Sequence, residues 1–263
     1  MQDAPTKRRT HASKTHVVTS FGRADQTYVV LAATFAVVLV LTNIIGVKLF
    51  VLWPEGRPDW FPGAGPLTLT SGIITYPLTF LLTDLVSEFW GQRRANLMVI
   101  IGFGMSLLML FFVEVALALE PSDFWANEDL GLDKVAMQGA FEVTFQFPAL
   151  LLGASMLAYL VAQLFDVYLY HFWKRLTGGS HMWLRNNGST AISQLVDTII
   201  VNGVFLTFGF GMAPADVAGV IVAVYLVKLV LALLDTPLIY LGRSLLARFF
   251  GLTNTDWREA PLA

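Results

Sequence analysis

Six apolar segments occur along this chain, and each is about as long as a helix that crosses a membrane. They cover residues 28–52, 67–87, 95–119, 145–172, 190–210 and 216–241. A spanning helix needs about 20 mostly apolar residues, and backbone N–H and C=O groups facing lipid must be paired internally. The segments therefore predict an all-α integral membrane protein built as a bundle of six transmembrane helices.

The composition supports lipid as the main solvent of the chain. Hydrophobic residues make up 56% of the 263 residues and charged residues 14%, whereas an average soluble domain is about 25% charged. A net charge of −2 gives no support for nucleic-acid binding, so we expect no nucleic-acid partner. The sequence has no cysteine, which excludes disulfides, thiolate metal sites and cysteine nucleophiles.

The two ends of the chain are more polar than its centre. Residues 1–26 are polar and basic, and the apolar run that follows them is too long for a signal-peptide core and shows no small-residue cleavage site. We expect three parts: a disordered cytoplasmic tail over residues 1–26, a six-helix transmembrane domain over residues 27–242, and a cytoplasmic segment over residues 243–263.

Lys and Arg gather on one side of the predicted bundle. Thirteen of the 17 lie in the N-terminal tail, the second and fourth connections and the C-terminal segment, while the other side holds only Arg57 and Lys134. The positive-inside rule therefore places both termini in the cytoplasm. The long outer connection over residues 120–144 is acidic and has room for a short surface helix.

Ionisable and amide side chains interrupt several spans, and each is a candidate functional group because burying it in lipid is costly. In the second span, Asp84 and Glu88 are four residues apart and share a helix face. Glu88 lies near the predicted interface, where water can solvate it. Polar residues also join helices by hydrogen bonds worth about 0.6–2 kcal/mol per pair, so a purely structural role remains open.

The fourth and fifth spans repeat one polar pattern. Gln163 and Asp166 are three residues apart in the fourth span, and Gln194 and Asp197 have the same spacing in the fifth. On adjacent antiparallel helices, we expect the two pairs to face each other in the cytoplasmic half. Asn202 points about 140° away from Asp197 on a helical wheel.

The sixth span carries Lys228 near its centre and Asp235 seven residues later. A lysine at that depth needs a carboxylate partner. The candidates are Asp84, Asp166, Asp197 and Asp235, and both a structural salt bridge and a ligand or proton site remain open. In the first span, the amide of Asn43 is too short to reach water.

A polar stretch, TGGSHMWLRNNGST over residues 177–190, precedes the fifth span. We predict a cytoplasmic turn at the start of the helix. Capping by Asn187, Ser189 or Thr190 is its structural interpretation, since short polar side chains accept hydrogen bonds from free N–H groups there, but capping explains only one of these residues. Part of this turn, including Asn187, is also a candidate gate that closes a cavity from the inside.

Motifs of the common enzyme classes are missing from the sequence. It contains no Ser-His-Asp arrangement, zinc motif, Walker sequence or dinucleotide fingerprint, and its four histidines lie in the tail or at the cytoplasmic boundary. We therefore expect a protein that is not an enzyme and that has no metal and no cofactor. Amides, carboxylates and one lysine facing a bundle interior favour a transporter for a small, planar, hydrogen-bonding solute.

Four stretches resemble the bacterial queuosine precursor transporters, which are grouped with vitamin uptake transporters: LTNIIGVKLF, ITYPLTFLLTDLVSEFWG, AQLFDVYLY and WLRNNGSTAISQLVDT. The resemblance covers about residues 28–242. It implies six transmembrane helices in the cell inner membrane and uptake of a 7-deazaguanine, chiefly 7-cyano-7-deazaguanine or its aminomethyl relative. It also implies a distant likeness to the substrate-binding subunits of energy-coupling-factor transporters.

The edge of such a base offers an N1–H and an exocyclic amine, which one carboxylate accepts together. We expect Asp84 or Asp197 to take that role, and Phe80, Tyr76 or Tyr159 to cover a face of the ring. Lys228 would balance the charge of the carboxylates and be the proton-sensitive element. The predicted substrate-binding residues are Asn43, Asp84, Gln163, Asp166, Gln194, Asp197 and Lys228, and the predicted gating or cavity-lining residues are Glu88, Asn187, Asp235 and Tyr76.

The sequence is compatible with two modes of operation. The first is a self-contained secondary transporter, with the proton as the candidate coupling ion. The second is the binding subunit of an ATP-driven importer, for which Gly102 and Gly104 in GFGMSLLML are a candidate docking face. A homo-oligomer is compatible with either mode, and a membrane enzyme or scaffold is the least favoured alternative.

Overall fold

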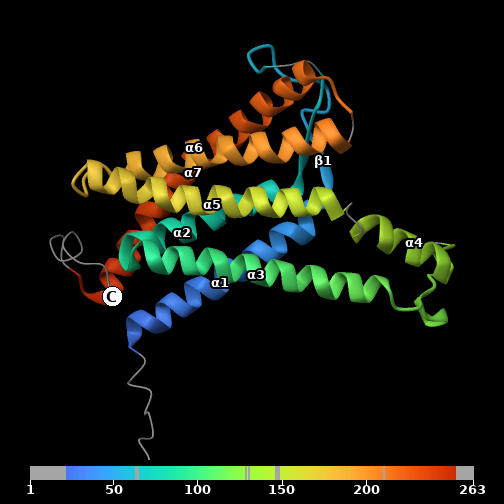
Figure 1. The fold of residues 1–263 in the computed structure, drawn as a ribbon, viewed down its shortest axis with the longest axis horizontal. Coiled ribbons are helices and arrows are strands. Elements are labelled where there is room, and N and C mark those ends of the chain that lie inside the picture. Colours follow the sequence, from blue (N-terminus) through green and yellow to red (C-terminus); the bar gives the residue numbers. More distant parts are fainter. Residues whose placement is uncertain are drawn as a thin grey trace, which may run out of the picture.

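The computed structural model describes residues 22–62, 65–127, 129, 131–145, 149–209 and 211–252. Long helices dominate the described part of the chain, with one β-hairpin between the first two of them (Figure 1). The helices are α1 (Arg23–Gly46), α2 (Tyr76–Trp90), α3 (Gln92–Leu117), α4 (Lys134–Phe145), α5 (Ala149–Leu176), α6 (Met182–Val204) and α7 (Pro214–Phe250).

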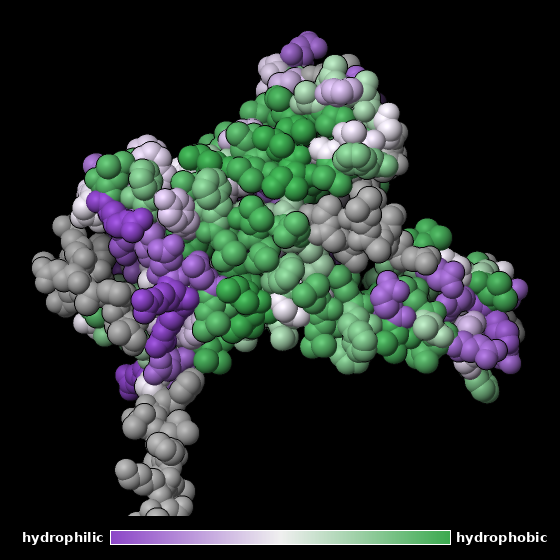
Figure 2. Space-filling model, viewed as in Figure 1, coloured by the Kyte–Doolittle hydropathy of each residue, from purple (hydrophilic) through white to green (hydrophobic). Residues whose placement is uncertain are grey.

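Four helical stretches of the described residues are long and apolar enough to cross a membrane: Arg23–Gly46, Ser71–Leu117, Met182–Phe208 and Pro214–Phe250. The second stretch contains both α2 and α3, which turn at Gly91, where φ is 81°, and then lie side by side (Figure 1). Apolar residues cover the middle of the molecule, and hydrophilic residues gather toward its ends (Figure 2). The prediction of a helical membrane protein is confirmed.

Aromatic rings bring three helix ends together. The ring of Trp90, the last residue of α2, lies 6.1 Å from the ring of Tyr28 in α1 and 5.8 Å from that of Phe250, the last residue of α7. The start of α1 and the end of α7 therefore lie at the same end of the bundle, which we call the Trp90 end. The β-hairpin lies at the opposite end, the hairpin end (Figure 1).

Close packing joins α1 to α3. Phe35 and Leu39 of α1 are buried and point at Gly102 of α3, where an added Cβ would lie 2.4 Å from the ring atom Cε1 of Phe35. A glycine at this position is what allows the two helices to approach so closely. Val86 of α2 and Met98 of α3 belong to the same apolar core.

The β-hairpin corrects the predicted ends of the first two spans. Strand β1 (Leu49–Leu52) pairs antiparallel with β2 (Leu67–Thr70), although both had been expected to be helical. Leu67 and Leu69 of β2 are buried and pack with Ala223 and Val224 of α7. The fold is therefore not entirely α-helical, because one short hairpin packs against the helical bundle. A 3-10 turn, Ser71–Ile74, leads from it into α2.

The start of α6 corrects the predicted polar turn. The helix begins at Met182, so Asn187, Ser189 and Thr190 lie inside it and cap nothing. Its inward face is polar, and the reversal of the chain occurs before it, at Gly178 and Gly179, which both have positive φ. Periodicity misplaced this boundary because polar residues here are buried against other helices rather than exposed in a turn.

Other predicted boundaries fall partly outside the described residues. Of the predicted tail over residues 1–26, only residues from 22 onward are described, and α1 already begins at Arg23. At the other end α7 continues through Pro237 to Phe250, beyond the predicted end of the sixth span, and residues 253–263 are not described. The predicted outer connection contains α4, the short helix for which its length has room.

Candidate functional site

A cavity of about 660 Å³ lies among the long helices and extends to the residues of the hairpin. We call it the main cavity. Its walls are mostly apolar, and its volume is in the range of small-molecule sites, about 300–1,000 Å³. The polar side chains on its walls come from six helices and are Thr42, Asn43, Tyr76, Ser106, Ser155, Tyr159, Asp197, Asn202 and Lys228, with Arg57, Thr68 and Thr70 contributed by the hairpin region.

An ion pair between α6 and α7 forms part of the cavity wall. Lys228 Nζ donates to Asp197 Oδ2 at 2.7 Å, and the two side chains are only 14% and 5% exposed. The same ammonium group lies 4.7 Å from the ring centroid of Tyr76, at the start of α2. Of the four carboxylates considered as partners of Lys228, the structure selects Asp197.

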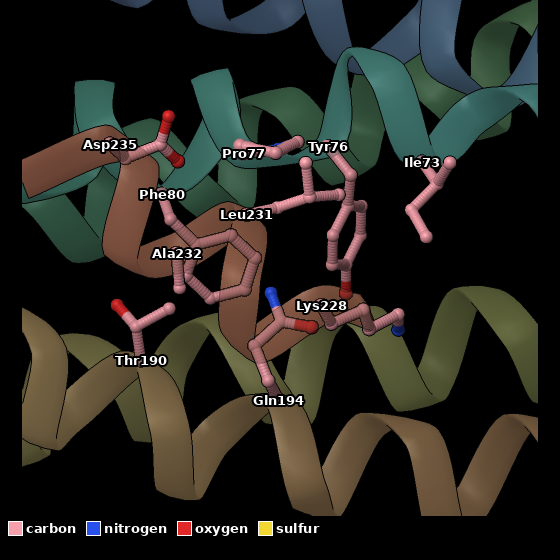
Figure 3. A pocket seen from close by; sticks show the side chains of 10 residues that line it. All are labelled: Ile73, Tyr76, Pro77, Phe80, Thr190, Gln194, Lys228, Leu231, Ala232 and Asp235. Carbon is pink, nitrogen blue, oxygen red and sulfur yellow. The ribbon is translucent and has the colours of Figure 1, made fainter. Parts of the chain in front are cut away.

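A smaller pocket adjoins the main cavity and shares Tyr76 and Lys228 with it. Figure 3 shows Gln194 of α6 pointing between Phe80 and Lys228, with Thr190 and Asp235 at one end of the pocket. The amide oxygen of Gln194 is buried and has no hydrogen-bond partner among the described residues. It is therefore an acceptor available to a ligand.

Two amides line the main cavity nearer the hairpin end. Asn43 of α1 donates its Nδ2–H to Ser106 Oγ of α3 at 3.1 Å, which leaves its carbonyl oxygen uncommitted by that bond. Asn202 of α6 donates to the backbone carbonyl of Thr198 at 3.0 Å. Sequence reasoning had set Asn202 apart from Asp197, but the main cavity contacts more than one face of α6 and both residues line it.

Gln163 and Asp166 lie deeper in the bundle and line neither cavity. Gln163 of α5 donates from Nε2 to Thr79 Oγ1 of α2 at 3.1 Å and accepts from Thr83 Oγ1 at 3.4 Å. Asp166 accepts from Ser193 Oγ of α6 at 2.9 Å. The Gln163/Asp166 pair and the Gln194/Asp197 pair therefore have different partners and do not bond to each other.

Asp84 of α2 is fully buried beside Asp166. The two carboxyl groups lie within interacting range, and neither oxygen of Asp84 accepts a hydrogen bond from a donor among the described residues. Asp84 lines neither cavity. If this residue contacts a substrate, it does so in another conformation of the bundle.

Glu88 is the centre of a buried ionic network at the Trp90 end. Its oxygens lie 2.6 Å from Arg185 NH2, 3.0 Å from Lys174 Nζ and 3.6 Å from Arg243 Nε, and Tyr170 donates its hydroxyl to Glu88 at 3.0 Å. The expected solvation of Glu88 at the membrane interface is wrong, because this side chain is 1% exposed. We call these five residues the Glu88 network.

Arg185 is a buried member of this network that the sequence pattern did not indicate. The sequence predicts a loop position for Arg185, but the residue lies inside α6 and is fully buried, with further bonds to Tyr170 Oη and the carbonyl of Gly179. Two features of the sequence could have pointed to this contact. The arginine is followed directly by small polar residues, and the carboxylate of Glu88 needed a cationic partner.

Two further predicted residues lie on α6 and α7. Asn187 donates to Thr236 Oγ1 at 2.9 Å and thus joins α6 to α7, without lining either cavity. Asp235 lines the smaller pocket. Within the described ranges, no three His, Asp or Glu side chains converge in a way that could hold a metal ion.

Comparison with known proteins points to one family. Residues 70–242 match the family model described as "Putative vitamin uptake transporter". The chain is also 35% identical over 183 residues to a protein of Bacillus subtilis (strain 168) named "Probable queuosine precursor transporter", an alignment that covers 68% of this chain and 74% of that protein. No solved structure matches the chain. The region matched by the family model contains the Asp197–Lys228 pair and Glu88.

Proposed function

This chain belongs to the vitamin uptake transporter family, and from that premise we propose that it imports a queuosine precursor, 7-cyano-7-deazaguanine or its aminomethyl form, across the bacterial inner membrane. The name of the Bacillus subtilis relative supports this class of substrate. The observation that carries the proposal is the Asp197–Lys228 pair beside Tyr76, which gives the wall of a mostly apolar cavity an acceptor, a donor and an aromatic face.

A 7-deazaguanine has complementary chemistry. Its N1–H and exocyclic amine are donors, and the carboxylate of Asp197 can accept both. Lys228 can donate to the ring carbonyl, and the rings of Tyr76 and Tyr159, whose centroids are 6.1 Å apart, offer aromatic surface to the face of the base. Gln194 and Asn43 supply further amide groups at the two ends of this region.

Discrimination would follow from burial. Polar groups inside an apolar cavity are left unpaired when a solute lacks the matching atoms, and such sites reject the wrong ligand strongly. Asp84, Gln163 and Asp166 lie beneath the cavity walls, so we assign direct contact with the substrate to Asn43, Tyr76, Gln194, Asp197 and Lys228 in this conformation.

We further propose six membrane crossings with both termini in the cytoplasm. The shared Trp90 end of α1 and α7 supports an even number of crossings. Arg94, Lys174, Arg185 and Arg243 also lie at that end, so the positive-inside rule assigns the Trp90 end to the cytoplasm. The hairpin end then faces outward.

This orientation implies toward which side of the membrane the main cavity extends. The main cavity extends toward the outer side, whereas the Glu88 network ties α2, α5, α6 and α7 together on the cytoplasmic side. In an import cycle the substrate would enter from the hairpin end, and the ion pairs of the Glu88 network would have to separate before release into the cytoplasm.

We propose that the chain acts as a secondary transporter. The candidate docking face for an ATPase module comprises Gly102 and Gly104, of which Gly102 is covered by Phe35 from α1 and only Gly104 is open. Uptake of the labelled precursor by proteoliposomes that contain only this chain tests the choice. Tight binding with no uptake would instead favour the binding subunit of an energy-coupling-factor importer.

The function itself is tested in a strain that cannot make the precursor. Supplied with 7-cyano-7-deazaguanine, cells that express this chain should regain queuosine in their tRNA, and cells expressing Asp197→Asn should regain much less at limiting precursor. Asp216→Asn is the matched control, because Asp216 is exposed in the first turn of α7 and lies at neither cavity. Failure of the wild type to restore queuosine would refute the substrate assignment.

A further inference from the structure

Two carboxyl groups lie together in the interior of the bundle, and no ion pair joins either of them to a cation among the described residues. Asp84 of α2 and Asp166 of α5 are both fully buried, and the two groups are in interacting range. Ser193 donates to Asp166 Oδ1, while Asp166 Oδ2 and both oxygens of Asp84 have no hydrogen-bond donor among the described residues. A buried polar atom without a partner is costly, so three such atoms in one place need a reason.

The nearby charged groups are committed elsewhere. Arg185 of α6 interacts electrostatically with Asp84, but its hydrogen bonds go to Glu88, Tyr170 and the carbonyl of Gly179. Lys174 of α5 bonds to Glu88, and Arg243 of α7 lies beside the same carboxylate. Lys228 of α7 is paired with Asp197.

A single proton would link the two carboxyl groups by one hydrogen bond. Two adjacent carboxylates in a medium of low polarity repel each other and cannot both stay ionised. With one proton bound, the O–H of one carboxyl donates to a free oxygen of the other, and the pair carries one negative charge instead of two. No bond other than this O–H forms or breaks.

We propose that Asp84 and Asp166 together bind one proton and form the coupling site of proton-driven import. This inference rests on the proposed function for its role in transport, and on burial and missing donors for the proton itself. It moves the proton-sensitive element from Lys228, where sequence reasoning had placed it, to the carboxyl pair.

The position of the pair suits such a role. Along α2, Tyr76, Phe80, Asp84 and Glu88 follow at intervals of four residues and so share one face, which places the pair between the cavities and the Glu88 network. Gln163, which is hydrogen-bonded to Thr79 and Thr83, lies between the main cavity and the Asp84–Asp166 pair. Polar side chains therefore continue through the bundle from one end of this face to the other.

Loss of the proton would weaken the Glu88 network, which closes the cytoplasmic side. The fully ionised pair attracts the guanidinium of Arg185, which also holds Glu88 at 2.6 Å. Competition for Arg185 weakens the Glu88 network, so release of the proton to the cytoplasm would favour opening on that side. Proton binding would favour its closure.

Transport by reconstituted protein separates coupling from binding. In proteoliposomes, the wild type should exchange labelled 7-cyano-7-deazaguanine across the membrane without a gradient, and should accumulate it about tenfold per unit of imposed pH difference if one proton is coupled. Asp84→Asn and Asp166→Asn should keep the exchange and lose the accumulation, because an amide donates to the remaining carboxylate without a transferable proton. Asp216→Asn should retain both.

A second measurement follows the proton directly and needs no substrate. Infrared spectra of the wild type at neutral pH should contain the carbonyl band of a buried protonated carboxylic acid, sensitive to exchange into heavy water. The band should disappear in Asp84→Asn and in Asp166→Asn and persist in Asp216→Asn. The proposal would be overturned if the wild type lacks this band, or if the band persists in both single variants. Either result decides the question whether or not the variants transport.

The outcomes also separate the two proposals. If the wild type does not exchange the precursor, the proposed function is wrong, and the infrared band alone decides whether the pair holds a proton. If the wild type exchanges and accumulates the precursor while Asp84→Asn and Asp166→Asn still accumulate it under a pH gradient, the function stands and the coupling site is wrong.

Discussion

Lys228 of α7 and Asp197 of α6 form a 2.7 Å ion pair that is nearly closed to solvent and lies beside the ring of Tyr76. The pair holds two helices together and presents a charged acceptor and donor to the main cavity. Its two roles make opposite demands, since full mutual neutralisation favours stability whereas recognition requires that a ligand can share the charges. The first prediction separates these roles.

Neutralising one partner should cost more stability than neutralising both. Asp197→Asn and Lys228→Met each leave an unpaired buried charge or polar group, and breaking a buried pair in this way typically costs about 3–5 kcal/mol. The double variant should recover most of that loss in thermal unfolding measurements in detergent, yet should still bind 7-cyano-7-deazaguanine weakly. A double variant that binds as well as the wild type would show that the pair is only structural.

The Glu88 network should control access from the cytoplasm. Glu88→Gln removes the charge that holds Arg185, Lys174 and Arg243, so the Trp90 end should open more often. Since the chain has no cysteine, Ser87→Cys introduces a single thiol at a fully buried position next to the network. In inside-out vesicles, an impermeant thiol reagent should label it several-fold faster in the Glu88→Gln background.

The same thiol provides the control for that measurement. Ser87→Cys in the wild-type background should react slowly, and saturating precursor applied from the hairpin side should change the rate in both backgrounds. Equal labelling rates with and without Glu88→Gln would mean that the network does not close the cytoplasmic side.

Asn43 should contribute to binding beyond its contact with Ser106. Both residues line the main cavity, and their 3.1 Å hydrogen bond links α1 to α3. If the amide oxygen of Asn43 accepts from the substrate, Asn43→Ala should weaken binding by roughly tenfold, in line with about 0.5–1.5 kcal/mol for a neutral hydrogen bond. Ser106→Ala removes the same helix contact and should have the smaller effect, so equal effects of the two changes would assign Asn43 to structure.

Gly102 should be far less tolerant than Gly104. A Cβ at Gly102 would meet the Phe35 ring at 2.4 Å, whereas one at Gly104 would meet nothing within 4 Å. Overpacking of a close contact typically costs about 1–3 kcal/mol, so Gly102→Ala should lower the unfolding temperature and Gly104→Ala should leave it nearly unchanged. Equal tolerance at both positions would contradict the close approach of α1 and α3.

Apolar length and charge asymmetry were sufficient to predict the class of fold. They identified the helical membrane protein because long lipid-facing runs leave few alternatives. They could not predict the hairpin, since Leu49–Leu52 and Leu67–Thr70 are short apolar runs whose strand and helix periodicities are not distinguishable. The start of α6 at Met182 was missed because its polar residues are buried by partners that only the assembled bundle provides.

The candidate site was predictable in its residues and not in its pairing. Asp197 and Lys228 could be identified individually, because they are charged residues within apolar spans. Four carboxylates could have paired with the lysine, and only the packing of the helices decides among them. Glu88 and Arg185 are 97 residues apart in sequence, and their 2.6 Å contact depends on how α2 and α6 cross. No local pattern encodes that distance.

Binding of two ligands to two proteins tests the central claim most directly. Equilibrium binding is measured for 7-cyano-7-deazaguanine and for its analogue without the exocyclic amine, with wild type and with Asp197→Asn. If Asp197 accepts from that amine, loss of the amine should weaken binding to the wild type by roughly 10- to 100-fold, as expected for a hydrogen bond to a charged group. The same loss should matter little to Asp197→Asn; full and equal losses in both proteins would contradict the assignment of Asp197 to the substrate.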